Sequence, residues 1–83
     1  MMIKVVLSAK QFGNLVKINR KKYHLTQKEL AAVCGCGVRF IQDLEKGKQS
    51  CELGLSLSVL AMLGIRLEAI TPVIPEAVLH VIK

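Results

Sequence analysis

Side chains that can bind nucleotides are concentrated between residues 26 and 48. Arg39 can donate two parallel hydrogen bonds to guanine O6 and N7, and Gln42 can form the matching pair with adenine. Val38 can pack on the methyl group of thymine. Three lysines have the charge to contact phosphates without reading the bases: Lys28, Lys46 and Lys48. These residue types predict a surface that reads base edges and holds a DNA backbone.

Phe40 and Asp43 lie among these residues, and each has two interpretations. The Phe40 ring either touches the sugar–phosphate edge of DNA or is buried against the protein. The Asp43 carboxylate repels phosphate unless it faces a base amino group or a neighbouring arginine. Both residues are therefore candidates for DNA contact.

Two short helices joined by a tight turn are predicted to position these side chains. Thr26 is a good N-cap, and Glu29 three residues later completes a capping box. Gly35 fits the left-handed conformation in which a helix ends, and Gly47 stops the second helix. Apolar residues recur at helical spacing in that second helix: Val38, Ile41 and Leu44. Helix, glycine turn and helix form a helix-turn-helix unit, whose second helix lies in the major groove.

The same run resembles the phage Cro/C1-type repressors, often called the Xre family. The matching elements are Leu25-Thr26-Gln27, Leu30-Ala31, Gly35, Ile41 and Glu45-Lys46-Gly47-Lys48. Three further elements are similar to HipB-type regulators, the DNA-binding antitoxins encoded beside HipA-like kinase toxins: Arg39-Phe40-Ile41, Glu52-Leu53-Gly54 and Met62 to Leu67. The resemblance covers about residues 10–70.

The resemblance implies a mainly α, lambda-repressor-like domain of four to five helices with a short C-terminal β-strand, acting as a dimer. It implies that Gln27 contacts a phosphate and braces the recognition helix. It also implies that the C-terminal strands pair across the dimer. The sequence departs from the family at Gly37, the N-cap of the recognition helix, where Ser or Thr is usual. Glycine lacks the hydroxyl that could cap the helix or touch a phosphate.

Two more helices are predicted on either side of this pair. Ser8 can cap a helix that runs to about Lys22, with these residues facing inward: Phe12, Leu15, Val16 and Ile18. Ser50 can cap a helix from about Glu52 to Leu63, which Gly64 closes. Two basic residues at the end of the first helix are further candidates for phosphate contact: Arg20 and Lys22.

The helix over 52–63 is apolar on two sides. One stripe consists of Leu53, Leu57, Leu60 and Ala61, and the other of Leu55, Val59 and Met62. Two apolar sides need two sets of neighbours, and we expect a second copy of the chain to supply one of them. The expected dimer or partner contacts are Leu55, Val59, Met62, Leu67, Ala69 and Ile70.

Residues 65–71 alternate in the manner of a strand. A lone strand leaves its backbone groups unpaired, so a partner is needed. Residues 3–7 of the same chain and the two-fold copy of 65–71 are both candidates, and the sequence does not choose between them. Residues 75–83 are mostly apolar after a first turn suited to a helix, and we expect them to dock on the dimer or to bind another protein.

The size and charge of the chain agree with this organisation. The 83 residues fit one domain, with a helix-turn-helix core at about 10–64 and residues 65–83 for dimerisation or partner binding. A hydrophobic content of 52% with only two Phe and one Tyr predicts an aliphatic core, with some apolar surface buried between subunits. Residues 1–50 hold ten Lys or Arg against three acids, whereas residues 51–83 hold two against three. The half with the helix-turn-helix is therefore predicted to bind an anionic partner.

Other classes of function have no pattern in their favour. The three cysteines, without a secretory signal or a membrane-spanning stretch, favour the cytoplasm. Cys34-Gly35-Cys36 has neither the spacing nor the number of ligands of a zinc site, so we expect no metal and no cofactor. Paired carboxylates, a nucleophile with an orienting base and a phosphate-binding glycine loop are all missing, so we expect no enzyme.

The sequence thus predicts a transcriptional repressor that binds double-stranded DNA at a palindromic operator. Through the resemblance, it predicts the antitoxin and autoregulator of a type II toxin–antitoxin operon with a HipA-like kinase toxin. One alternative is a stand-alone or prophage regulator of the Xre type without a toxin. Another is a protein-binding adaptor that has lost DNA binding, an idea to which Gly37 and Asp43 give slight support.

Overall fold

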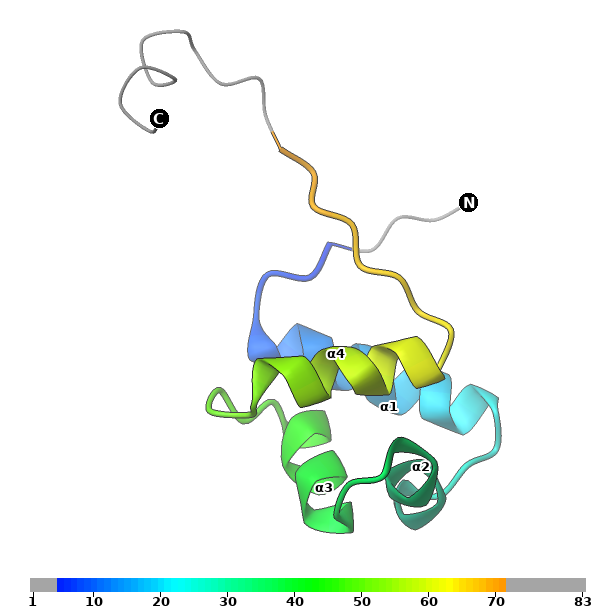
Figure 1. The fold of residues 1–83 in the computed structure, drawn as a ribbon. Helices are drawn as coiled ribbons and strands as arrows, with labels where there is room; N and C mark the ends of the chain where they lie inside the picture. Colours follow the sequence, from blue (N-terminus) through cyan, green and yellow to red (C-terminus); the bar gives the residue numbers. More distant parts are fainter. Residues whose placement is uncertain (1–4, 72–83) are drawn as a thin grey trace, which may run out of the picture.

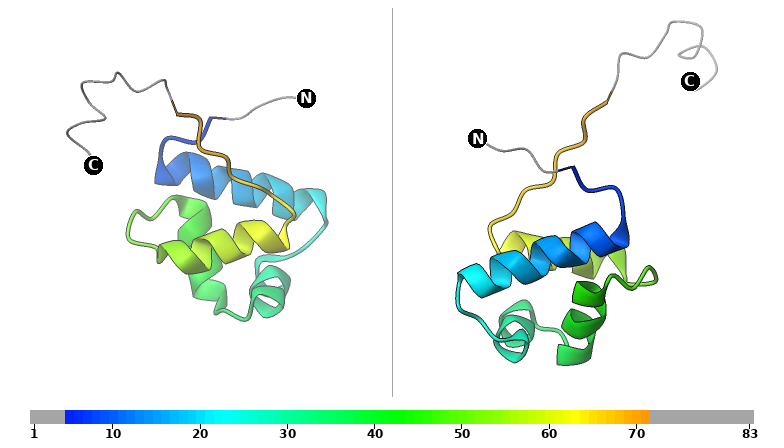
Figure 2. Two further views of the ribbon diagram at one scale, coloured as in Figure 1. Left: turned by 45° about the horizontal axis from the view of Figure 1, so that its top comes forward. Right: turned by 180° about the vertical axis from the view of Figure 1, so that it is seen from behind.

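The computed structural model describes residues 5–71, which form four helices. They are α1 (Ala9–Lys22), α2 (Gln27–Cys34), α3 (Val38–Lys46) and α4 (Leu53–Met62) (Figure 1). α1 and α4 run across one side of the domain, and α2 and α3 lie below them, as the further views in Figure 2 also show. α3 contacts both α1 and α2, and α2 contacts α4. The mainly α fold class is confirmed, and α2 and α3 are the predicted helix-turn-helix pair.

Local signals determine where the first three helices begin and end. Ser8 caps α1, because its hydroxyl accepts a backbone N–H of the first turn at 3.1 Å. Thr26 and Glu29 form both hydrogen bonds of the predicted capping box, at 3.0 and 2.8 Å. α2 ends at Gly35 with φ 69°, and α3 ends at Gly47 with φ 86°. Residues with a Cβ adopt these left-handed values only at a cost, so glycine is favoured at both ends.

The core between the helices is aliphatic, as the composition predicts. Eight hydrophobic residues are buried: Val16, Leu30, Ala31, Ile41, Leu44, Val59, Leu60 and Leu63. All four helices contribute to this cluster, and Phe12 and Phe40 pack against it from its edge. The apolar burial therefore fixes α3 against α1, α2 and α4 at once.

α1 and α3 also approach each other at the level of the backbone. A Cβ at Gly13 would overlap the carbonyl oxygen of Leu44 and lie 3.0 Å from that of Glu45. A Cβ at Gly47 would lie 2.7 Å from the Cα of Lys10. Because no side chain separates the two helices at these points, α1 holds the C-terminal half of α3 closely in place.

The start of α4 differs from the prediction. The N-cap is Glu52, whose carboxylate accepts the N–H groups of Gly54 and Leu55 at 2.8 and 3.0 Å. The prediction that Ser50 is the cap is therefore wrong. A carboxylate satisfies two unpaired N–H groups and suits the positive end of the helix dipole, so it replaces the hydroxyl here. Gly64 follows the helix with φ 73°, as predicted.

The faces of α4 also differ from the prediction. Val59, expected in the dimer interface, is fully buried in the core of its own chain. Leu55 is half-buried, and Met62 is 52% exposed. Since α4 is apolar nearly all round, its periodicity did not show which side faces inward. Three residues of the other predicted stripe are exposed: Leu53, Leu57 and Ala61.

Ile18, predicted to face inward, is exposed as well, by 45%, and Val33 of α2 is exposed by 54%. Each lies two positions after a buried residue, Val16 in α1 and Ala31 in α2. Two positions correspond to a rotation of about 200° around a helix, which places them on the outer side. Phe12 and Leu15 are half-buried, in agreement with the prediction.

The predicted strand over 65–71 is not present, and residues 5–71 contain no strand. Ile65 packs against the core, and its N–H donates to Leu60 O at 2.9 Å. Beyond it the chain runs away from the helices, with Leu67, Ala69 and Ile70 exposed (Figure 1). Residues 5–7 do not pair with this segment, so pairing across a dimer stays a prediction. Residues 3–4 of the other predicted strand, and the segment 75–83, lie outside the described residues.

Within residues 5–71, no helix has the length and apolar character needed to cross a bilayer.

Candidate nucleic-acid interface

The outward side of α3 carries the residues predicted to read bases. The side chain of Arg39 is 83% exposed, and Val38 is 40% exposed. Gln42 is half-buried, and Lys46 is exposed at the end of the helix. These positions share one side because Ile41 and Leu44 turn the other side into the core. α3 therefore presents a guanidinium, an amide, an apolar side chain and an ammonium group on one side.

The two open interpretations on α3 are resolved by the contacts of the side chains. The Phe40 ring is half-buried and packs against the core, which favours the structural interpretation. Asp43 faces a neighbouring arginine, since Arg39 Nε donates to its Oδ1 at 3.3 Å. Lys48 Nζ lies 3.5 Å from its Oδ2. The carboxylate thus lies between two cations rather than alone on the surface.

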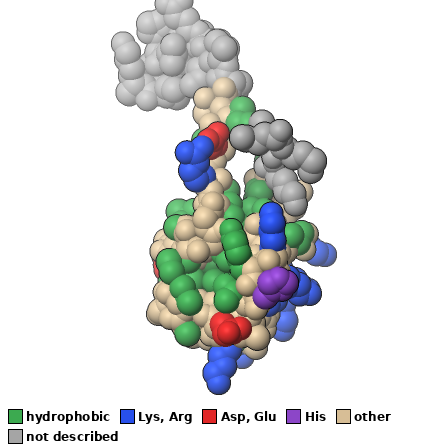
Figure 3. Space-filling model, turned by 90° about the vertical axis from the view of Figure 1, so that its right-hand side faces the viewer, with side chains coloured by type: hydrophobic (Ala, Val, Ile, Leu, Met, Phe, Trp, Pro, Cys, Tyr) green, Lys and Arg blue, Asp and Glu red, His purple; other side chains and the backbone are tan. Residues whose placement is uncertain are grey.

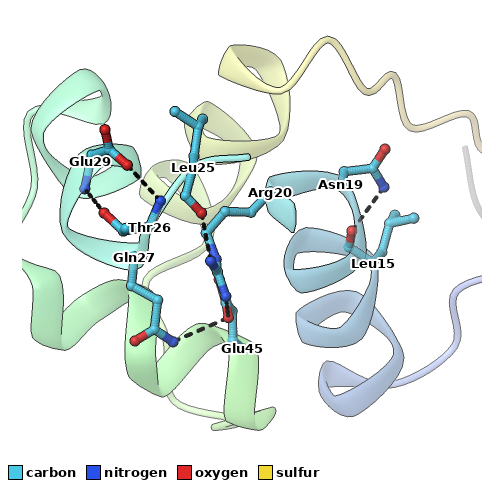
Figure 4. Close-up of polar contacts among 8 residues, drawn as sticks. All are labelled: Leu15, Asn19, Arg20, Leu25, Thr26, Gln27, Glu29 and Glu45. Atoms are coloured by element: carbon cyan, nitrogen blue, oxygen red, sulfur yellow. Dashed lines mark hydrogen bonds and ion pairs between the residues drawn. The ribbon is translucent and has the colours of Figure 1, made fainter. Parts of the chain in front are cut away.

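A buried ion pair holds α3 from behind (Figure 4). Arg20 Nε and Nη2 donate to the two carboxylate oxygens of Glu45 at 2.7 and 3.0 Å. The two side chains are only 9% and 3% exposed. Arg20 Nη1 also donates to the carbonyl oxygen of Leu25 at 2.7 Å. This two-point geometry ties α1, the loop after it and α3 together, and it leaves Arg20 unable to contact a phosphate.

Gln27, the first residue of α2, joins the same network. Its Nε2 donates to Glu45 Oε1 at 3.2 Å (Figure 4). Gln27 therefore makes the contact to α3 that the resemblance implies. An amide nitrogen carries two N–H groups, so the second one is the group that can donate to a phosphate.

The N-terminus of α2 is well ordered by its cap. The Thr26 hydroxyl accepts the N–H of Glu29, and Thr26, Gln27 and Lys28 follow one another at the start of the helix. The backbone N–H and then the hydroxyl of Thr26 lower the pKa of Glu29 by hydrogen bonding to its carboxylate. Thr26 and Lys28 are exposed. The N–H groups of this end are favourable positions for a phosphate.

Gly37 caps α3 without a hydrogen bond from a side chain, in line with its departure from the family. A Cβ at this position would meet nothing within 4 Å, so space does not require glycine here. The exposed amides at the start of α3 are thus left open toward the outside.

Cationic and apolar side chains separate over the surface. Figure 3 shows apolar side chains gathered on one side of the face in view, with Lys and Arg along the opposite edge and at the lower end. The lower end is the end of α2 and α3 in Figure 1. The three predicted phosphate contacts are all exposed: Lys28, Lys46 and Lys48.

Comparison with known families decides the class of this surface. The family model HTH_3, described as helix-turn-helix, matches residues 16–70, which are 55 of the 83 residues. The chain belongs to this helix-turn-helix family. A relative from Sinorhizobium fredii (strain NBRC 101917 / NGR234), the uncharacterized HTH-type transcriptional regulator y4mF, is 44% identical over 71 residues. That alignment covers 86% of this chain and 93% of the relative. The protein is a DNA-binding helix-turn-helix transcriptional regulator of the Xre type.

Solved structures place the fold of this helix-turn-helix regulator beside that of HipB. The HipB-O4 20mer complex has a chain that matches with a TM-score of 0.75 at 23% identity, over 83% of this chain and 97% of that one. The structure of the HipA-HipB-O2-O3 complex has a chain that matches with a TM-score of 0.76 at the same identity and coverage. At this identity the likeness shows the fold.

The Arg20–Glu45 ion pair of the regulator was not predicted from the sequence, although both residues were named there. The two are 25 positions apart, and nothing in the local pattern joins them. The position of Glu45 next to the core residue Leu44 could have predicted this pair. A carboxylate that is buried there needs a cation from another helix.

The part of the regulator that the structure describes holds no group of three or more residues suited to a metal ion. Cys34, Cys36 and Cys51 are free thiols, all half-buried. Partial burial raises the pKa of each thiol, which favours its protonated form.

Proposed function

We propose that this regulator is a homodimeric, sequence-specific repressor and the HipB-like antitoxin of a type II toxin–antitoxin operon. Its partners are double-stranded operator DNA and a HipA-like kinase toxin, and it acts in the cytoplasm by binding rather than by catalysis. The observation that carries the proposal is the extent of the likeness to HipB. The match covers 97% of the matched chain in both complexes, rather than the helix-turn-helix alone.

The exposed apolar residues support the homodimer. Leu53 and Leu57 lie four positions apart on the outer side of α4, 68% and 42% exposed, with Met62 at its end. Leu67 and Ile70 add 47% and 77% exposed side chains in the segment that follows. A small monomer seldom leaves so many large apolar groups in water. A two-fold copy would cover them and would supply the strand partner that residues 66–71 lack among the described residues 5–71.

Such a dimer would present two α3 helices to adjacent major grooves, about 34 Å apart. Arg39, Gln42 and Val38 would read the bases of each half-site. Lys28, Lys46 and the start of α2 would hold the phosphates on both sides of the groove. The operator would then be a palindrome with its half-sites one helical turn apart.

The proposal is tested by co-expressing the regulator with the product of the neighbouring gene, followed by purification and footprinting of the upstream DNA. We expect a kinase to co-purify with the regulator, and a protected palindrome whose occupancy falls as salt is raised. A protected palindrome without a bound kinase would identify a stand-alone regulator, a reading consistent with the name of the S. fredii relative. A kinase bound without any protected DNA would identify a protein-binding adaptor. Light scattering of the purified protein measures the subunit number, and a monomer would contradict the dimer.

A further inference from the structure

Arg39 and Asp43 lie one turn apart on the outward side of α3. Arg39 Nε donates to Asp43 Oδ1 at 3.3 Å, and Lys48 Nζ lies 3.5 Å from Oδ2. The position of Lys48 is itself fixed, because its backbone N–H donates to the carbonyl oxygen of Asp43 at 3.0 Å. One carboxylate therefore links a cation in the first turn of α3 to a cation just beyond its last turn.

The pair determines which hydrogen-bond donors of Arg39 remain for DNA. A guanidinium has five N–H groups in one plane, and the one on Nε points to Asp43. Of the four N–H groups on the two terminal nitrogens, one lies parallel to the Nε–H, and one on each nitrogen points end-on, away from that bond. Guanine offers O6 and N7 side by side in the major groove, and the two terminal nitrogens match that spacing. The bond at Nε also restricts the rotation of a side chain that is 83% exposed.

We propose that Asp43 is a positioning residue, which holds Arg39 end-on for guanine and so sets base preference without contacting a base itself. This inference rests on the proposed reading of DNA by α3. It accounts for an acidic residue on a surface that meets phosphates, since its charge is offset by those of Arg39 and Lys48. Partial burial opposes ionisation, but the hydrogen bonds and positive charges of these two residues outweigh it and lower the pKa of Asp43. The carboxylate is therefore charged at neutral pH and available to Arg39.

The test measures base preference with a pool of random-sequence duplexes, from which the bound fraction is sequenced. The proteins are the full-length wild type, Arg39→Ala, Asp43→Ala and the double variant. Lys48→Ala is the matched control, because it removes the other partner of the same carboxylate. Thermal unfolding of each variant by circular dichroism verifies that it is folded under the binding conditions.

We expect Arg39→Ala to reduce the preference for guanine at one position about five- to hundredfold. Asp43→Ala should reduce the preference at that same position about two- to fivefold, the range that an exposed ion pair allows. In the Arg39→Ala background, Asp43→Ala should have no further effect on any position. Lys48→Ala should weaken binding to all sequences alike and leave the guanine preference unchanged.

Two results would overturn the inference while leaving DNA reading intact. In the first, folded Asp43→Ala keeps the full guanine preference of the wild type. In the second, the substitution changes the preference at a different base pair and does so also without Arg39, which would mean direct contact of Asp43 with a base. A wild-type pool with no enriched sequence would overturn the inference together with the proposed function.

Discussion

Removing the carboxylate of Glu45 should destabilise the domain strongly, because it leaves a buried guanidinium without its partner. In Glu45→Ala, Arg20 loses two hydrogen bonds of 2.7 and 3.0 Å, although its side chain is only 9% exposed. Breaking a buried pair from one side costs about 3–5 kcal/mol. At about 0.05–0.15 kcal/mol per residue, a domain of this length has an unfolding free energy of about 4–12 kcal/mol. The substitution therefore removes a quarter or more of the total stability.

Thermal unfolding by circular dichroism at fixed protein concentration measures this loss. Each kcal/mol shifts Tm by about 4–8 °C in a domain of this size, so Glu45→Ala should lower Tm by about 12–40 °C. Arg39→Ala is the matched control, since it breaks the exposed pair with Asp43, which is worth about 0–1 kcal/mol. A decrease of less than about 4 °C for Glu45→Ala would refute the reasoning, because Arg20 would then be solvated rather than buried with an unpaired charge.

The double variant Arg20→Met/Glu45→Leu separates stability from DNA binding. Replacing a buried ion pair by apolar residues of similar size is often neutral, so Tm should return close to that of the wild type. Gln27 would still lack the Glu45 oxygen that accepts from its Nε2. We therefore expect a folded protein with weaker binding to all duplexes, measured by fluorescence anisotropy. Wild-type affinity in this variant would show that the bond from Gln27 to α3 does not contribute to DNA contact.

Three further predictions concern single residues. Gly13→Ala should lower the unfolding free energy by about 1–3 kcal/mol, because the added Cβ meets the backbone of α3. In a helix with open space at that position, the same substitution raises the unfolding free energy by about 1 kcal/mol. Stabilisation of Gly13→Ala in a urea titration would contradict the close approach of α1 and α3. Lys46→Ala should weaken binding to every duplex alike and reduce the slope of log affinity against log salt concentration by about one unit. An altered base preference would exclude a role limited to phosphate contact. The pKa of Glu29 is lowered in the folded state, so its contribution to stability is present above its ordinary value of 4.5 and is lost as the pH falls through the folded value. Glu29→Gln keeps the cap bond without the titration, so its Tm should depend less on pH between about 3 and 6 than that of the wild type; equal pH dependence would argue against this role.

The parts of the fold that could be predicted are those decided within a few residues. The capping box at Thr26 and Glu29 closes over three positions, and Gly35 and Gly47 meet a local need for positive φ. Such signals act in the isolated segment before any tertiary contact forms, so the sequence alone contains them. Ser50 failed for a local reason too, because a stronger cap, Glu52, lies two positions later.

The inward sides of the helices were harder to predict, because they depend on how the helices meet. Val59 and Leu57 are both apolar residues of α4, yet one is fully buried and the other is 42% exposed. Their difference comes from the position of α4 over α2, which no periodicity within an apolar helix specifies. The strand over 65–71 failed similarly, since alternation describes a possible strand but supplies no partner for its backbone.

The candidate site on α3 could be predicted in part, more than the inward sides of the helices and less than the helix ends. The inward residues Ile41 and Leu44 were predicted correctly, and once they are fixed, Arg39 and Lys46 are bound to face outward. The types of the outward side chains could therefore be read as a DNA-binding set from the sequence. The contacts among these side chains could not be predicted, because Asp43 had several possible partners within reach. The structure shows the Asp43 carboxylate between Arg39 and Lys48. Because of this contact, the predicted effect of Asp43 changes from repulsion of DNA to orientation of Arg39.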